Sequence, residues 1–296
     1  MSQSIGVSRI DAAALGVAAS AYAAEAQPPS DNGTLLVVRN NRSQNFPVGW
    51  SPSEVSVFGQ YLWVANSIGD GSRSSAVQNS VTMLDTDTGR VATTTVPLPD
   101  QIAATAGGAW VLSNSTPLEL RFVSDSGVVS PPTQVPGNEP GSVVANGEST
   151  WVATGNLTDN SLTVYSVKRV GSGPQLQLSA VAKATGFAPV LAISGSQPVL
   201  GFTTTLGTGP STVEWTPSAN GLSVTVPGVL DTLSASQGLV TVTNKEGVFF
   251  VFADTGKCLG RATLPPGETA VSSAVSAANV EVVSGAGHLY VGLITP

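Results

Sequence analysis

The chain has 296 residues, of which 41 % are apolar and only 10 % are charged, and its formal net charge is −7. It contains no cluster of Lys and Arg, so it lacks the basic surface that nucleic acids and anionic membranes require. No run of residues approaches the ~18 consecutive apolar positions of a membrane-spanning helix. Its one cysteine and one histidine exclude an intrachain disulfide and any site that needs two of either residue.

The N-terminal 33 residues differ in composition from the rest of the chain. The segment 8–26 is rich in alanine, and Ser8 with Asp11 resembles a capping box at its start, which predicts a helix. Residues 1–33 are therefore expected to form a partly helical N-terminal arm. Two roles remain open for this arm: a docking arm, or a weak signal peptide (residues 1–26) that ends in a small-residue cleavage site.

A short motif recurs through the remainder of the chain. It consists of a turn, an aromatic-aliphatic strand and a final Asn, Ser or Thr, as in GQYLWVANS at 59–67 and GGAWVLSNS at 107–115. The central positions of the six copies are Trp63, Trp110, Trp151, Val199, Val240 and Tyr290. Their spacing of 41 to 50 residues is that of a four-stranded propeller blade. We expect the three tryptophans to pack between blades.

Each repeat divides into four predicted strands. In the first repeat these are SEVSVF, YLWVAN, VTMLD and VATTT, separated by turns that contain Gly, Asp or Asn. The pattern predicts an all-β fold, a six-bladed β-propeller of four-stranded blades over residues 34–296. Residues 279–296 supply two strands of the sixth blade and residues 34–49 supply the other two, so N-terminal strands are expected to close the ring.

The first repeat reads PxxVxxxGxxLWVAN, then LDTDTGRV, then VPLP. This pattern resembles the YVTN-type and virginiamycin B lyase-like propeller repeats. Proteins of that group include lyases, lactonase-like hydrolases, sensor ectodomains and binding scaffolds, so the resemblance implies a fold more than an activity. The streptogramin-lyase mechanism uses histidines near the central channel. This chain has only His288, which we expect to be an exposed turn residue away from the channel mouth.

Lactonase-like propellers imply a second kind of site, a calcium site of Glu, Asn and Asp at the channel mouth, because oxygen ligands suit Ca²⁺. The matching positions before the innermost strands carry five carboxylates and Ala188. These candidate metal ligands are Glu54, Asp100, Glu139, Asp231 and Glu281. No Asn joins them in register, so Ca²⁺ is the one cofactor candidate and no complete catalytic set is found.

The expected N-terminal arm, the C-terminus and two long loops, at 67–79 and 265–279, converge on one face of the predicted ring. Irregular loops on a rigid scaffold are where partners bind. The candidate partner-binding residues are Ile10, Leu15, Val17, Tyr22, Asp70, Arg73, Glu268 and Pro296. The expected partners are proteins, either copies of this chain or other assembly subunits.

Three functional classes follow from these observations. The first is a non-enzymatic structural or interaction propeller in a larger extracellular or virion-type assembly, favoured by the low charge, the arm and the absence of a catalytic set. The second is a secreted or envelope-anchored ligand-binding or sensor propeller, with residues 1–26 as its leader. The third is a lyase or lactonase-like enzyme with a metal at the acidic rim.

Overall fold

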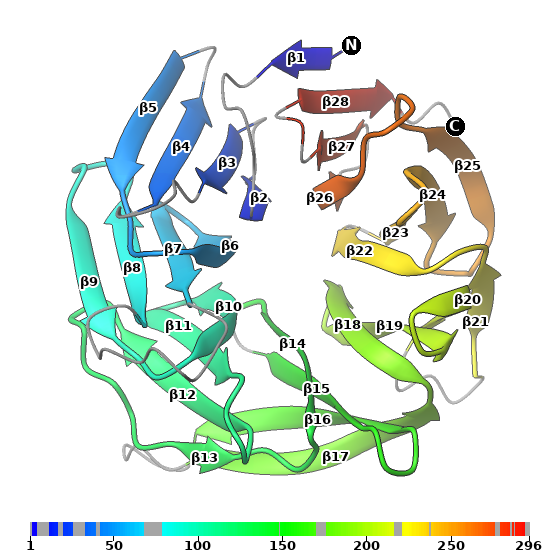
Figure 1. Cartoon of the computed structure of the whole chain (residues 1–296), viewed down its shortest axis with the longest axis horizontal. Coiled ribbons are helices and arrows are strands. Elements are labelled where there is room, and N and C mark those ends of the chain that lie inside the picture. Colours follow the sequence, from blue (N-terminus) through cyan, green and yellow to red (C-terminus); the bar gives the residue numbers. More distant parts are fainter. Residues whose placement is uncertain are drawn as a thin grey trace.

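The computed structural model shows an all-β ring of seven four-stranded antiparallel sheets around a central opening (Figure 1). The described residues are 2–4, 12–16, 20–25, 33–39, 42–67, 79–147, 149–169, 176–215, 221–236, 238–275, 279–284, 286 and 288–293. No helix occurs among them. The four-stranded blade and the propeller arrangement predicted from the repeat are confirmed.

Six of the sheets each consist of four consecutive strands. The first three are β2 (Ala12–Gly16), β3 (Ser20–Glu25), β4 (Thr34–Arg39) and β5 (Arg42–Pro47); β6 (Pro52–Phe58), β7 (Tyr61–Asn66), β8 (Ser80–Asp85) and β9 (Val91–Thr95); and β10 (Pro99–Thr105), β11 (Gly108–Ser113), β12 (Glu119–Ser124) and β13 (Thr133–Gln134). The next three are β14 (Glu139–Ala145), β15 (Thr150–Asn156), β16 (Ser161–Arg169) and β17 (Leu176–Thr185); β18 (Phe187–Ser194), β19 (Gln197–Thr205), β20 (Thr208–Trp215) and β21 (Ser223–Val226); and β22 (Leu230–Ser236), β23 (Leu239–Asn244), β24 (Val248–Ala253) and β25 (Cys258–Thr263).

The seventh sheet joins the two ends of the chain. It contains β26 (Ala270–Val275), β27 (Asn279–Ser284) and β28 (His288–Leu293), and its outer strand is β1 (Ser2–Ser4), which pairs with β28. The innermost strands contact their neighbours all the way around the ring, including β26 against β2. Closure by an N-terminal strand is therefore confirmed, although a different strand performs it from the one we expected.

The expected count of six blades is wrong because the sequence analysis merged two sheets into one. Residues 34–49 hold β4 and β5, which pair with β3 rather than with the C-terminal strands. The expected helical arm contains β2 and β3 instead, and its other residues lie mostly outside the described ones. Alanine favours a helix locally, but pairing with a neighbouring strand overrides that preference.

The Trp motif marks the second strand of a blade and packs against the next blade, as predicted. Trp63 is 2 % exposed and lies in a cluster with residues of the β10–β13 sheet. In the last two blades the predicted positions of the motif are wrong. When the strand pairs are counted from the β-bulge near the start of the innermost strand, the residues equivalent to Trp63 are Thr241 and Glu281, not Val240 and Tyr290. Val240 is one residue out of register and Tyr290 lies on a third strand, because the later copies lack the tryptophan that marks the register.

The Asn, Ser or Thr that ends the motif is a buried structural residue. The equivalent residues at the ends of the second strands are all buried, namely Asn66, Ser113, Thr154, Thr203, Asn244 and Ser284. The Thr154 hydroxyl donates to the Pro136 carbonyl at 2.6 Å, and the Asn244 amide donates to the Pro227 carbonyl at 2.8 Å. These bonds satisfy carbonyls of the connections between blades, which have no ladder partner.

Antiparallel pairing gives the ring two distinct faces. The connections between blades and the turns from second to third strand lie at one end of the strands, which we call the loop face. The turns from first to second and from third to fourth strand lie at the opposite face. The innermost strands begin at the loop face, so residues at their starts surround the channel mouth there.

Candidate functional site

A cavity of about 590 Å³ fills the channel and is the candidate site. Its described lining comes from six innermost strands, β6, β10, β14, β18, β22 and β26. Cavities of this size suit small molecules or single protruding side chains. The lining combines carboxyl groups near the channel mouth with hydroxyl and aliphatic groups, and no Lys or Arg is among its described residues.

Glu54 links two adjacent innermost strands at the mouth. The Ile102 backbone N–H of β10 donates to Glu54 Oε2 at 2.6 Å, and two residues further on the Ala104 N–H donates to the Ser56 hydroxyl at 2.9 Å. An innermost strand is an edge with unpaired N–H groups, and side chains from the preceding blade satisfy them here. Burial raises the pKa of Glu54 to about 8; the Ile102 hydrogen bond opposes the rise and the nearby charge of Asp100 adds to it.

Glu139 repeats this arrangement two blades later. The Ala188 N–H of β18 donates to Glu139 Oε1 at 3.1 Å, while Glu139 Oε2 is buried without a hydrogen-bond partner. Burial raises the pKa of Glu139, and the Ala188 hydrogen bond offsets part of that rise. Ala188 has a left-handed φ of 49°. The Glu139 carboxyl group therefore accepts a hydrogen bond from a residue whose backbone conformation is rare for L-amino acids.

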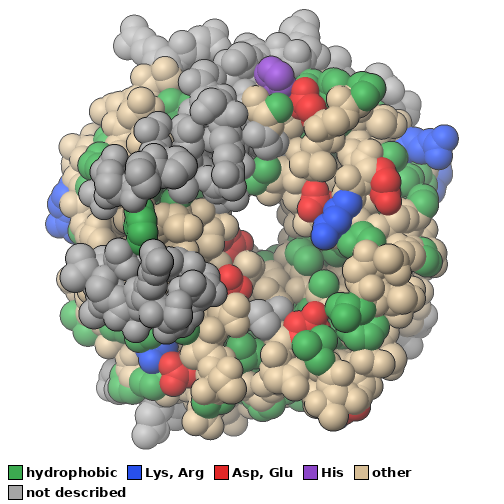
Figure 2. All heavy atoms as spheres, viewed as in Figure 1, with side chains coloured by type: hydrophobic (Ala, Val, Ile, Leu, Met, Phe, Trp, Pro, Cys, Tyr) green, Lys and Arg blue, Asp and Glu red, His purple; other side chains and the backbone are tan. Residues whose placement is uncertain are grey.

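Two further carboxyl groups belong to the mouth. Burial raises the pKa values of Asp100 and of Asp231, and the charge of Lys245 opposes the rise for Asp231. Asp231 lines the cavity from β22, on the other side of the channel from Glu54. Figure 2 shows acidic side chains on both sides of the central opening. The mouth therefore concentrates carboxyl groups whose ionisation is held back by burial.

One wall of the cavity, the hydroxyl wall, is lined by the hydroxyl groups of Thr232, Ser234 and Ser273, which belong to β22 and β26. Two threonines of the next strand, Thr241 and Thr243 of β23, are fully buried beside this wall and do not line the cavity. The Thr232 hydroxyl lies 2.6 Å from that of Thr243 and 2.9 Å from that of Ser273, and Ser234 lies 3.3 Å from Ser273. Thr241 is 0 % exposed and its Oγ1 has no hydrogen-bond partner. The sequence analysis missed Thr241 because it placed the tryptophan position of this repeat at Val240, one residue too early.

The predicted acidic rim is assembled only in part. Glu54, Asp100, Glu139 and Asp231 lie within the first three residues of their innermost strands, as expected. Glu281 does not join them, because it lies on the second strand β27 opposite Ala274. Across the described residues, no three His, Cys, Asp or Glu side chains come close enough to hold one metal ion. We therefore derive no chemistry from Ca²⁺.

His288 lies in a second polar cluster, at the seam where the chain closes. Its Nδ1 lies 3.0 Å from Glu268 Oε1, and the Tyr290 hydroxyl donates to the same oxygen at 2.7 Å. The expectation of an exposed turn residue is wrong: His288 begins β28 and is half-buried against Glu268, which connects β25 to β26. Burial raises the pKa of Tyr290 to about 12, and its bond to Glu268 adds to the rise.

Most predicted partner-binding residues fall where the structure gives no side-chain description. Ile10, Val17, Asp70, Arg73 and Pro296 lie outside the described residues, and Leu15 and Tyr22 are described only as parts of strands β2 and β3. Glu268 is described, and its bonds to His288 and Tyr290 are internal. Two exposed apolar residues that the sequence analysis missed, Leu157 and Leu206, lie on the loop face in second-to-third-strand turns of adjacent blades.

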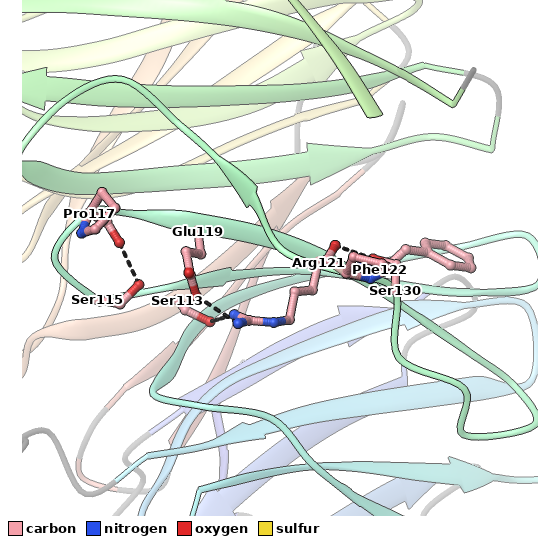
Figure 3. A network of polar contacts seen from close by, with 8 residues as sticks. Ser113, Ser115, Pro117, Glu119, Arg121, Phe122 and Ser130 are labelled. Atoms are coloured by element: carbon pink, nitrogen blue, oxygen red, sulfur yellow. Dashed lines mark hydrogen bonds and ion pairs between the residues drawn. The ribbon is translucent and has the colours of Figure 1, made fainter. Parts of the chain in front are cut away.

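The Arg121 side chain forms a third polar cluster, within the β10–β13 sheet (Figure 3). Its guanidinium lies 2.7 Å from Glu119 Oε2 and donates to the Ser113 hydroxyl at 3.4 Å. Arg121 is 8 % exposed. A buried charge is tolerated when it is paired and hydrogen-bonded, and both conditions are met internally. This cluster therefore holds two strands together and offers no free charge to a ligand.

Together, the ring of four-stranded sheets and its central channel define a β-propeller. No protein-family model matches the chain, and no curated protein matches it. Solved structures do match. Virginiamycin B lyase from Staphylococcus aureus has a TM-score of 0.69 at 10 % identity, over 100 % of this chain and 99 % of that one. BamB from Moraxella catarrhalis has a TM-score of 0.61 at 12 % identity, over 98 % of each chain.

Raptor from Chaetomium thermophilum has a TM-score of 0.70 at 13 % identity, over 99 % of this chain but only 29 % of that one. At such identities the likeness establishes the fold alone. One of these proteins is named a lyase and the other two are not, so the shared fold does not decide between catalysis and binding. In the part of the chain that the structure describes, no helix has the length and apolar character to cross a membrane.

Proposed function

We propose that this chain is a non-enzymatic interaction β-propeller, a subunit of a larger assembly that binds a protein partner through its loop face. The observation that carries the proposal is the pairing of apolar and acidic features on that face. Leu157 is 48 % exposed and Leu206 is 62 % exposed, on neighbouring blades, and carboxyl groups surround the channel mouth. Exposed apolar side chains beside polar groups are typical of protein-binding surfaces.

The docking role is assigned to the loop face rather than to an N-terminal arm. Strands β1, β2 and β3 form ladders within the ring, so their backbone groups are engaged in closing it. The setting we propose, an extracellular or virion-type assembly, is supported by the 10 % charge content.

The test compares complexes of the full chain isolated from its source by native mass spectrometry. The loop-face double variant Leu157→Ser with Leu206→Ser removes the apolar contacts. Val128→Ser is the matched control, because Val128 is 68 % exposed in the turn between β12 and β13 on the opposite face. We expect wild type and the control to have the mass of a complex heavier than the 29.8 kDa chain, and the double variant to be released from that complex.

Two results would contradict the proposal. A monomeric wild-type chain in its source would remove the assembly role. A double variant that stays in the complex as fully as the control would move the contact away from the loop face. Thermal unfolding of all three proteins establishes that any release does not reflect loss of the fold.

A further inference from the structure

We propose that Leu157 is a pre-formed anchor of the loop-face contact, and that Asn138 is the positioning residue that holds the Leu157 turn in its binding conformation. This inference rests on the proposed function and describes how the loop face would recognise its partner. The matching feature on the partner is an apolar pocket that takes up one leucine side chain.

The turn that carries Leu157 joins β15 to β16, and a segment from outside the turn holds its start. The Leu157 backbone N–H donates to Asn138 Oδ1 at 2.8 Å. Asn138 lies in the connection from β13 to β14, and its own N–H donates to the Gly155 carbonyl of β15 at 3.0 Å. This second bond fixes Asn138 against the end of β15, so its side chain meets the Leu157 backbone in a defined position.

The end of the same turn is also held. Asp159 Oδ1 accepts the Ser161 N–H at 3.0 Å, which fixes the step into β16. The Asn160 carbonyl accepts, at 2.9 Å, the N–H of Gly186, which connects β17 to the next blade. Backbone bonds to two neighbouring connections therefore restrain the turn on both sides of the Leu157 side chain.

These bonds order a residue that has no role in the described core. The Leu157 side chain is 48 % exposed and belongs to neither of the core clusters formed by its own blade. Ordering a contact residue before binding removes that entropy cost from the binding step. An aliphatic side chain held rigidly at an exposed position is therefore suited to act as an anchor in a partner's pocket.

Leu206, on the neighbouring blade, provides an internal comparison. It is 62 % exposed in the hairpin turn between Thr205 and Thr208. In the described part of the chain, no side chain hydrogen-bonds to the backbone of Leu206 or Gly207. Leu206 is therefore the adaptable contact of the loop face, and Leu157 is the pre-formed one.

Hydrogen exchange of the free full chain tests the positioning step. The Leu157 amide should be protected in wild type, and Asn138→Ala should make it exchange about tenfold faster, because its acceptor is lost. Asn138→Asp keeps the oxygen acceptor and should restore the protection. Asn114→Ala is the matched control, because Asn114 is also exposed in a loop-face turn, between β11 and β12, and its side chain makes no described hydrogen bond.

Competition for a place in the source complex tests the role in binding. Each variant is mixed with an equal amount of isotopically labelled wild-type chain, added to the partner fraction of the complex, and measured by native mass spectrometry. Asn138→Ala should bind about three- to tenfold more weakly than wild type, because the turn must then be ordered on binding. Asn138→Asp and Asn114→Ala should compete equally with wild type. Thermal unfolding of all variants should be unchanged, since Asn138 and Asn114 are exposed.

The inference is overturned if the Leu157 amide is unprotected in wild type, if Asn138→Ala competes as well as wild type, or if Asn138→Asp binds as weakly as Asn138→Ala. Its failure is separable from failure of the proposed function. If the Leu157 and Leu206 double variant loses its place in the complex while Asn138→Ala keeps its own, the loop-face contact stands and the positioning role is refuted. If the double variant also keeps its place, the proposed function is refuted and this inference with it.

Discussion

The unpartnered hydroxyl of Thr241 allows a sharp test of the interface between the β22–β25 sheet and the last blade. Thr241→Val keeps the shape of the side chain and removes the buried polar atom, and the preceding blade already carries Val199 at the equivalent position. A buried hydroxyl without a partner costs about 1–3 kcal/mol. We therefore expect Thr241→Val to stabilise the protein by about 1–2 kcal/mol, because it removes this cost without changing the shape of the side chain.

Thr243→Val is the matched control, made two residues further along the same strand and the same face. Thr243 is also 0 % exposed, but its hydroxyl lies 2.6 Å from that of Thr232 and accepts the Thr232 backbone N–H at 3.1 Å. Removing it leaves buried groups unpaired, so we expect a destabilisation of about 1–3 kcal/mol.

The assay is equilibrium unfolding in urea, with the m-value as a check that the unfolded states match. Opposite signs for the two variants are the expected result. The reasoning is refuted if Thr241→Val is neutral or destabilising, because its hydroxyl then has a partner, or if both variants shift the midpoint in the same direction.

Three further predictions concern packing, backbone and pH. Trp110→Ala should cost about 3–5 kcal/mol in urea unfolding, because this side chain is 4 % exposed between two blades. Gly141→Ala should cost about 1–3 kcal/mol, since the new Cβ would clash with the backbone oxygen of Ala153, whereas Gly260→Ala meets no atom within 4 Å and should change stability by less than about 0.5 kcal/mol. The seam carboxyl Glu268 has a lowered pKa: burial acts to raise it, but hydrogen bonds from neighbouring side chains prevail. Glu268 therefore contributes to stability above pH 4.5, its unfolded pKa, and this contribution is lost as the pH falls through the lower folded pKa. Tyr290 contributes to stability below pH 10.0, and this contribution is lost as the pH rises through its folded pKa of about 12. The stability difference between wild type and Glu268→Gln should accordingly be flat between about pH 5 and 10 and shrink on both sides; a difference independent of pH would contradict the assignment.

The candidate site could be predicted only in outline. The positions of Glu54, Asp100, Glu139 and Asp231 near the starts of innermost strands follow from the repeat spacing, so their presence at one mouth was accessible from the sequence. Glu281 was misplaced because the register of the last repeat carries no tryptophan. Leu157 and Leu206 were missed because an exposed leucine in a turn has no distinctive local pattern.

The sequence by itself determined the repeating unit of this protein. Turn glycines, alternating apolar residues and the Trp motif specify a four-stranded blade, because hairpin geometry and side-chain alternation act over a few residues. The tertiary structure decided the number of blades and the way the ring closes. The alanine-rich segment favours a helix on its own, and β2 and β3 form only where β4 and β6 offer a partner and a packing face. The channel mouth was decided in the same way, since Glu54 and Asp231 share one cavity only once strands far apart in the chain have closed the ring.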